Sequence, residues 1–266
     1  MQAAEIRRAV DRPTTELTTY DLYLRALPEC RSWDRERIRS ALDLLERAIE
    51  SDPNFGPALA AAAVCHHHFT TIGGIGDPGT HRRAALAYAH RALQASPSDP
   101  GTIANVASIL GYFGEDIEPA IALIDRALDL NPSFARGWGV SGWLRLWAGH
   151  QNVAVEHLQT AIRLSPLDRN ATQLFGIGVA RFFERRFDEA IATLLTTLSE
   201  LPGHAGIYRY LASCYAHAGR LENAREIVRQ LRTITPNVVP NVIQWRRPEH
   251  REFFLSGLRL AMGETP

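Results

Sequence analysis

The stretch AIALIDRALDLNPSFARGW, residues 120–138, decides how this sequence folds. Its first apolar residues are spaced four and three apart, which places them on one face of a helix: Ala120, Ile124 and Ala127. Asn131-Pro132 ends that helix, because the residue before a proline is pushed out of the α region. Trp138 then opens a new apolar face. The stretch therefore predicts a helix, a stop and the start of a second helix.

The same pattern recurs along the chain. Six stop prolines follow one another at gaps of 44, 35, 34, 36 and 34 residues: Pro53, Pro97, Pro132, Pro166, Pro202 and Pro236. Twelve positions before each stop stands an alanine: Ala41, Ala85, Ala120, Ala154, Ala190 and Ala224. A small residue allows two helices to cross closely, and a larger one would overpack the contact. The sequence therefore predicts repeated helical hairpins of about 34 residues.

This pattern resembles the tetratricopeptide repeat family, and it is clearest in residues 203–236, with Tyr208, Leu211, Ala212, Tyr215, Gly219, Ala224 and Pro236. The resemblance implies an all-α, right-handed superhelical solenoid of about six hairpins. We expect a lead-in over residues 1–18, the solenoid over 19–236, and an extended segment with a capping helix over 237–266. The first hairpin departs most from the pattern, with a short first helix interrupted at Pro28, whereas Asp34 is expected to cap the long helix that follows.

Composition limits the class of protein. With 45% hydrophobic and 22% charged residues, the chain has an ordinary globular composition. Its 29 basic residues, all arginine, balance 29 acidic ones, so charge gives no reason to expect nucleic acid or an anionic membrane as partner. Three scattered cysteines without a CxxC pair fit a reducing compartment. The N-terminus has no signal-peptide pattern, and we expect a cytoplasmic protein.

Three motifs could carry chemistry, and none of them predicts a site. The first is the run Cys65-His66-His67-His68. Successive side chains on a helix point about 100° apart, so these four cannot all face one metal. Cys214 and His217 could share a face, but they have no partner pair nearby in sequence. The glycine-rich stretch 71–79, TIGGIGDPG, lacks the GK[ST] of a phosphate loop and is expected to be a hairpin loop. We therefore predict no catalytic residue, no metal and no cofactor.

The predicted functional feature is a concave groove lined by the first helix of each hairpin. Residues at equivalent positions of the successive repeats form a face that is apolar and aromatic in its middle: Val64, His67, Asn105, Ile109, Tyr112, Arg136, Trp143, Leu146, Phe175, Val179, Phe182 and Arg209. Such a stripe usually marks a binding surface. The predicted function is a non-catalytic scaffold that binds a protein or peptide segment, favouring an amphipathic helix or an apolar extended segment. On this interpretation, Trp143→Ala with Phe182→Ala abolishes binding and leaves melting largely intact.

Two alternatives stay open. The stripe could be covered within the chain, and residues 238–245 are the candidate cover. In addition, residues 14–27, ending in TYDLYLRAL, and 248–261, PEHREFFLSGLRLA, resemble the ends of the repeat region of bacterial class III adenylate or guanylate cyclases. Related winged-helix transcriptional regulators carry a similar region. That resemblance implies a detached or truncated regulatory module of such a signalling system, acting in trans or by self-association, and it lends no cyclase activity.

Overall fold

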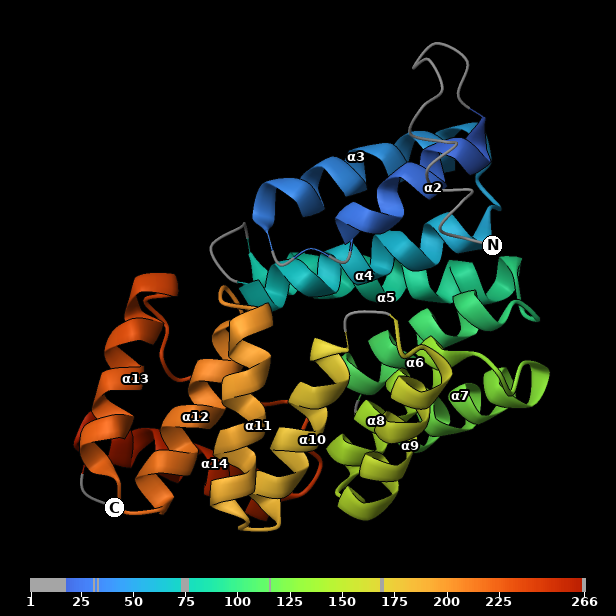
Figure 1. Ribbon diagram of the computed structural model, residues 1–266. Coiled ribbons are helices and arrows are strands. Elements are labelled where there is room, and N and C mark those ends of the chain that lie inside the picture. The colour runs from blue at the N-terminus through green and yellow to red at the C-terminus, as the bar shows by residue number, and fades with distance from the viewer. Residues whose placement is uncertain are drawn as a thin grey trace. The chain divides into compact units, whose positions relative to one another are not determined.

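The computed structural model describes residues 18–30, 32, 34–72, 77–114, 116–167 and 170–264, and within them the fold is all-α, as predicted (Figure 1). Thirteen helices follow one another in these described residues: α2 (Thr19–Cys30), α3 (Arg35–Ser51), α4 (Gly56–Ile72), α5 (Pro78–Ala95), α6 (Pro100–Phe113), α7 (Glu118–Leu130), α8 (Ala135–Ala148), α9 (Gln151–Leu164), α10 (Ala171–Phe183), α11 (Phe187–Glu200), α12 (Ala205–His217), α13 (Leu221–Ile234) and α14 (Pro248–Met262). Neighbouring helices pack as hairpins, and α14 caps the series.

The chain divides into two compact units, Met1–Glu115 and Asp116–Pro266. In the first unit α2 packs on α3, α4 packs on α5, and α6 packs against both α4 and α5. In the second unit α8 pairs with α9, α10 with α11 and α12 with α13, while α7 packs on α8. The division falls inside the third predicted hairpin, so α6 and α7 belong to different units.

The alanines that precede each stop proline are all at the helix crossings. Each is completely buried: Ala41, Ala85, Ala120, Ala154, Ala190 and Ala224. Glycines on the first helices make the same close approach possible from the other side. A Cβ on Gly142 of α8 would lie 2.6 Å from Leu158 Cγ of α9, and one on Gly178 of α10 would lie 2.9 Å from Leu194 of α11. These crossings confirm the role predicted for the small residues.

The helix ends follow local sequence with one exception. Asp34 caps α3 as predicted, since its carboxylate accepts a hydrogen bond of 2.9 Å from the Arg37 backbone N–H. Asp77 and Asp99 cap α5 and α6 in the same way. The predicted interruption at Pro28 is wrong, because α2 continues to Cys30. Pro28 lies in the last turn, so its missing N–H removes one intrahelical bond near the helix end and little helix remains to be broken.

The C-terminal part consists of a non-helical stretch and a capping helix. Residues 235–247 are non-helical, and α14 begins at Pro248, in the first helical turn where proline is well tolerated. Figure 1 shows α14 lying crosswise to α12 and α13, and it packs on both. The predicted lead-in lies outside the described residues apart from Thr18, whose hydroxyl donates to Asp21. None of the described helices has the length and apolar character needed to cross a bilayer.

Candidate protein-binding face

The residues predicted to line the groove all lie on the first helix of a hairpin, and within each unit we call the surface that these helices form the first-helix face of that unit. In the first unit it is made by α4 and α6. Ile109 is fully buried and Asn105 is 9% exposed, whereas Val64, His67 and Tyr112 are half-buried. The rings of His67 and Tyr112 are 4.2 Å apart. Two of the half-buried side chains therefore form an aromatic contact between α4 and α6.

His67 contributes to this part of the face as a neutral ring. Burial, together with the neighbouring His68, lowers the pKa of His67 to about 3. Its Nε2 atom is buried and has no hydrogen-bond partner among the described residues. The face of the first unit is therefore uncharged at this position, and a partner would meet an aromatic surface there.

The second unit places the remaining predicted residues on α8, α10 and α12. Trp143 is half-buried, and its ring lies 5.3 Å from that of Phe175. Arg136, also half-buried, has its guanidinium 5.9 Å from the Phe134 ring. The other side chains are buried, with exposed fractions between 0% and 9%: Leu146, Phe175, Val179, Phe182 and Arg209. Trp143 and Arg136 are thus the most accessible predicted residues of this unit.

Residues 237–262, which we call the C-terminal segment, cover the face of the second unit. Phe253 stacks on Phe182 of α10 at 5.0 Å between ring centroids. Phe254 stacks on Tyr210 of α12 at 4.3 Å, and Trp245 packs edge-on against Phe183 at 4.6 Å. Trp245 and Phe254 are 1% and 2% exposed. An aromatic layer from the segment thus covers α10 and α12 on this face.

Polar side chains of the same face hold the main chain of the C-terminal segment. Arg209 Nε donates to the Val238 carbonyl at 3.0 Å, and its Nη2 donates to the Asn237 carbonyl at 2.7 Å. Ser213 Oγ donates to the Phe254 carbonyl at 3.0 Å. His217 Nε2 lies 2.8 Å from the Phe253 carbonyl, which only accepts, so this nitrogen carries the proton. Burial lowers the pKa of His217, which keeps the ring neutral.

Of the two alternatives for the predicted stripe, the contacts in the second unit favour cover by the chain itself. The cover is longer than residues 238–245, because α14 supplies Phe253 and Phe254. Full burial of Phe182 also overturns the expectation that Phe182→Ala leaves melting intact, since truncating a buried phenylalanine costs about 3–5 kcal/mol.

Sequence reasoning missed two residues of this face, Phe183 and Tyr210, whereas it named His217 together with Cys214 without placing it among the groove residues. Phe183 and Tyr210 are neighbours of the predicted residues on α10 and α12, but they are not at the repeat positions from which the groove residues were predicted. The only sequence signal for these residues was the aromatic character of the C-terminal segment. That signal does not tell which residues of the segment meet which residues of the helices.

The histidine run packs into the first unit. His66 Nδ1 lies 3.0 Å from His81 Nδ1, and Cys65 Sγ lies 3.5 Å from Cys30 Sγ. Burial lowers the pKa of His66 to about 4, and the hydrogen bond with Cys30 together with burial raises that of the Cys65 thiol. Within the part of the chain that the structure describes, no three His, Cys, Asp or Glu side chains converge on a common point. Of the glycine-rich loop, residues 73–76 lie outside the described residues.

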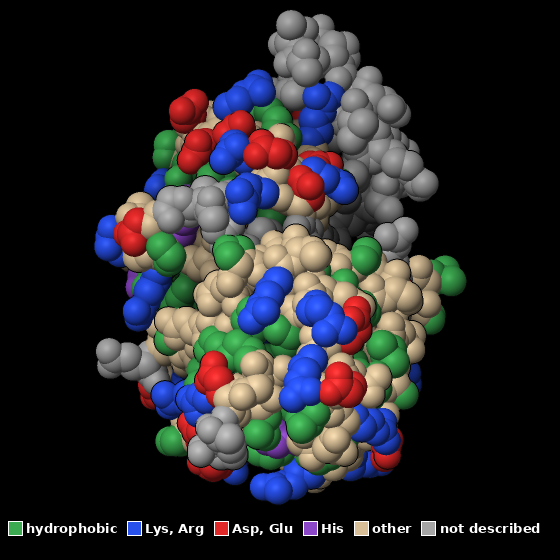
Figure 2. Space-filling view, turned by 90° about the vertical axis from the view of Figure 1, so that its left-hand side faces the viewer, with side chains coloured by type: hydrophobic (Ala, Val, Ile, Leu, Met, Phe, Trp, Pro, Cys, Tyr) green, Lys and Arg blue, Asp and Glu red, His purple; other side chains and the backbone are tan. Residues whose placement is uncertain are grey.

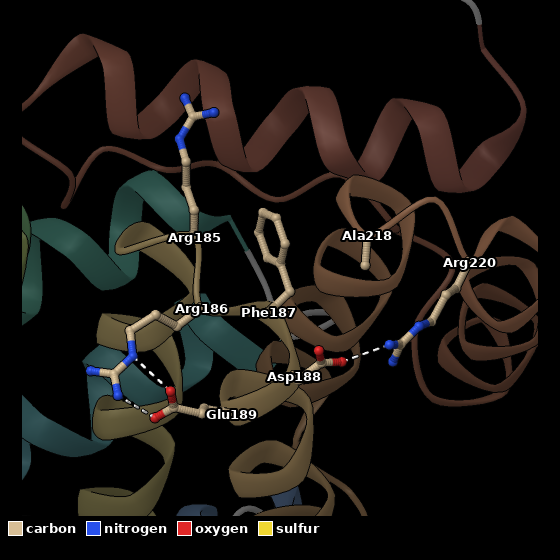
Figure 3. A pocket seen from close by; sticks show the side chains of 7 residues that line it. All are labelled: Arg185, Arg186, Phe187, Asp188, Glu189, Ala218 and Arg220. Atoms are coloured by element: carbon tan, nitrogen blue, oxygen red, sulfur yellow. Dashed lines mark hydrogen bonds and ion pairs between the residues drawn. The ribbon is translucent and has the colours of Figure 1, made fainter.

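An open depression lies at the turns before α11 and α13 (Figure 3). Four of its five charged side chains form ion pairs with one another. Arg186 forms a bidentate ion pair with Glu189, at 2.7 Å to each oxygen, and Arg220 pairs with Asp188 at 2.6 Å. Arg185, which has a positive φ of 62°, sends its guanidinium to within 4.8 Å of the Phe253 ring on α14. The depression therefore offers little net charge, and Arg185 belongs to the contact with the C-terminal segment.

Charge on the surface is mixed in sign. Figure 2 shows arginine side chains interspersed with aspartate and glutamate on the face in view. This distribution accords with the formal net charge of zero. A single-sign patch, the usual electrostatic footprint of a nucleic-acid-binding surface, is not visible on that face among the described residues.

Known proteins share this architecture. The chain is 30% identical over 108 residues to interferon-induced protein with tetratricopeptide repeats 2 from Cricetulus griseus, a match that covers 40% of this chain and 22% of that protein. Among solved structures, the Cut9–Hcn1 hetero-tetramer of the APC/C matches with a TM-score of 0.64 and 17% identity, over 97% of this chain and 46% of the other. The human IFIT1 dimer with m7Gppp-AAAA matches with a TM-score of 0.68 and 16% identity, over 84% and 52%. The chain thus spans about half or less of each of these relatives.

A comparison with protein families matches residues 31–100 and 175–238 to the tetratricopeptide repeat, which together make up half of the chain. The matched regions include the first, second, fifth and sixth stop prolines. With the helical hairpins, the buried alanines and this match together, the chain belongs to the tetratricopeptide repeat family.

Proposed function

We propose that this protein is a non-catalytic scaffold that binds a segment of a partner protein on its first-helix face. One observation carries the proposal. In the second unit this face holds an extended segment and a helix of the same chain, through carbonyl contacts from Arg209, Ser213 and His217 and through aromatic stacking. A surface that holds a segment in this way has the chemistry of peptide recognition.

The partly accessible residues of the face indicate the chemistry of the partner. Val64, His67 and Tyr112 in the first unit and Trp143 in the second are apolar or aromatic, and Arg136 is the single cation among the half-buried predicted residues. Burial of apolar side chains would supply most of the binding energy. The proposed ligand is therefore an apolar extended segment or an amphipathic helix.

Two tryptophans on α8 provide a matched test. Trp143 packs on Phe175 of α10 and lies on the first-helix face, whereas Trp138 packs on His157 of α9 and donates to the Pro132 carbonyl. Peptides would be selected from a random display library on the intact chain, and their affinities measured for the wild type, Trp143→Ala and Trp138→Ala. We expect Trp143→Ala to weaken binding at least about tenfold, the size of a hot-spot effect.

The control separates binding from folding. Both tryptophans are half-buried, so both substitutions cost stability, and melting curves should show similar losses. Trp138→Ala should keep wild-type affinity for the selected peptides. Equal affinities for the two variants, or a library that yields no binder to the intact chain, would contradict a peptide-binding role for this face.

A second candidate function is regulation of a cyclase or winged-helix regulator system. Its support is the resemblance of residues 14–27 and 248–261 to the ends of the repeat region in those proteins. The test is to search the neighbouring genes for a cyclase domain, and then to measure cyclase activity of that product with and without this chain. Unchanged activity would count against the candidate.

A further inference from the structure

We propose that the C-terminal segment is an exchangeable intramolecular ligand of the first-helix face of the second unit. The partner of that face would then present a segment of the same chemistry: an extended apolar stretch that leads into an amphipathic helix with two adjacent aromatic residues. This inference rests on the proposed function and names the ligand class and the regulation of the same face. While residues 237–262 are docked, the face is closed to a partner.

The first argument is that the face holds main-chain atoms. Four of its donor atoms, on Arg209, Ser213 and His217, point at backbone carbonyls of the segment, from Asn237 to Phe254. Every peptide has such carbonyls, so these contacts would be available to another segment in the same conformation. The side-chain contacts are mainly aromatic stacking, which tolerates exchange between aromatic residues.

The second argument is that several buried polar side chains of the segment are incompletely satisfied. Buried polar atoms of its side chains have no hydrogen-bond partner among the described residues: Gln244 Oε1, Trp245 Nε1, His250 Nδ1 and Arg251 Nε. Leaving buried polar atoms without partners costs free energy, and in folded cores such atoms are few. A concentration of them along one docked segment indicates a face that is not tailored to this occupant.

The third argument is the connection between α13 and α14. Residues 235–247 are non-helical and contain Pro236 and Pro240. The segment can therefore leave the face by rotation at the start of this connection, about residues 235–236, and α13 need not unwind. On the other side of the segment, the Arg185 guanidinium lies 4.8 Å from the Phe253 ring. The positive φ of Arg185 belongs to the C-terminal turn of α10, where the Arg186 N–H donates to the Arg181 carbonyl.

Gly257 offers a way to loosen the segment without altering the face. A Cβ at this position would lie 2.8 Å from the His217 ring and 2.9 Å from Ser213 Cβ, so α14 approaches α12 closely there. Gly257→Leu should therefore disfavour docking, while it raises the helix propensity of α14 itself. Gly203 lies in open space, with no atom within 4 Å of an added Cβ, so Gly203→Leu is the matched control.

The test uses a fluorescein-labelled peptide of residues 237–264 as the probe, added to the full chain and followed by fluorescence anisotropy. A docked segment lowers the apparent affinity in proportion to the fraction of open molecules. We expect Gly257→Leu to bind the peptide at least about tenfold more tightly than the wild type and Gly203→Leu do. A Gly257→Leu chain that binds the peptide no better than the control would overturn the proposal.

Hydrogen exchange on the wild type decides the question if Gly257→Leu fails to fold. Exchange of the α14 amides through an opening that leaves α12 and α13 protected supports the proposal. If the α14 amides exchange only when the α12 amides also exchange, the segment is part of the core, and this result overturns the proposal. The two proposals fail separately. Library peptides could bind equally well whether the segment is docked or released. That result would leave the proposed binding function standing and would refute the exchange.

Discussion

The consecutive histidines of α4 should make the protein sensitive to mild acid. Burial lowers the pKa of His67 to about 3 and that of His68 to about 4, from an ordinary value of 6.5. The unfolded chain therefore binds more protons than the folded one below pH 6.5. The stability that these neutral rings contribute is fully present above pH 6.5 and is lost as the pH falls toward 3 to 4.

The size of the loss follows from the two pKa values of each group. At pH 5.0 an imidazole with an unfolded pKa of 6.5 and a folded pKa of 3 to 4 loses about 2 kcal/mol. Both side chains are half-buried, so solvent screens part of this effect. We take about half of it, roughly 1 kcal/mol for each histidine at pH 5.0.

The assay is urea unfolding followed by circular dichroism at pH 7.5 and pH 5.0. His67→Phe keeps a ring against Tyr112 and removes the buried Nε2 atom that lacks a partner. The variant should lose about 1 kcal/mol less than the wild type between the two pH values. His90→Gln, at an exposed position on α5, is the control and should lose as much as the wild type.

The reasoning fails if His67→Phe and the wild type lose the same free energy of unfolding between pH 7.5 and pH 5.0. Such a result would mean that the ring is hydrated in the folded protein, or that it is equally shielded in the unfolded chain. A variant that gains stability at both pH values by the same amount would show a packing effect without a protonation effect.

Three further outcomes are expected. Cys30 and Cys65 are buried, and the pKa of the Cys65 thiol is raised, so both should resist alkylation by iodoacetamide at pH 7.5 in the folded protein and react in urea; rapid alkylation of the folded chain, followed by mass spectrometry, would contradict this packing. Gly142→Ala should cost about 1–3 kcal/mol in urea unfolding, because its Cβ would lie 2.6 Å from Leu158 Cγ, and a neutral result would mean that the helices can separate. Asp34→Ala should lower the free energy of unfolding by about 1 kcal/mol, because the cap of α3 is lost. Asp34→Asn should keep most of that stability, since asparagine also caps helices, and equal losses for the two variants would argue against the cap.

Much of the scaffold could be predicted from the chain alone. The stop prolines, the caps and the alanines twelve positions before each stop act over one or two helical turns, so local spacing reveals them. All six alanines are fully buried, as a close helix crossing requires. The Pro28 interruption was wrong for a related reason: a proline signal is local, and its effect depends on how much helix remains after it.

The candidate site could be predicted only in part. Placing the groove residues on the first helices required only the phase of the repeat, and most of the predicted residues of the second unit do meet the C-terminal segment or each other. The repeat positions alone could not reveal that this segment covers them, since the contacts of Arg209 with Val238 and of His217 with Phe253 join residues 29 and 36 positions apart.

Sequence by itself therefore determined the hairpin, its length and the residues at each crossing, because these depend on spacing within one repeat. Tertiary structure decided which apolar residues remain accessible, because accessibility depends on what a distant segment covers. The sequence predicts an apolar stripe on the first helices of the second unit, but only the folded chain shows that Phe253 and Trp245 pack against it. An apolar stripe on a helix is the same in sequence whether it meets a partner or its own chain, since the hydrophobic effect has no direction.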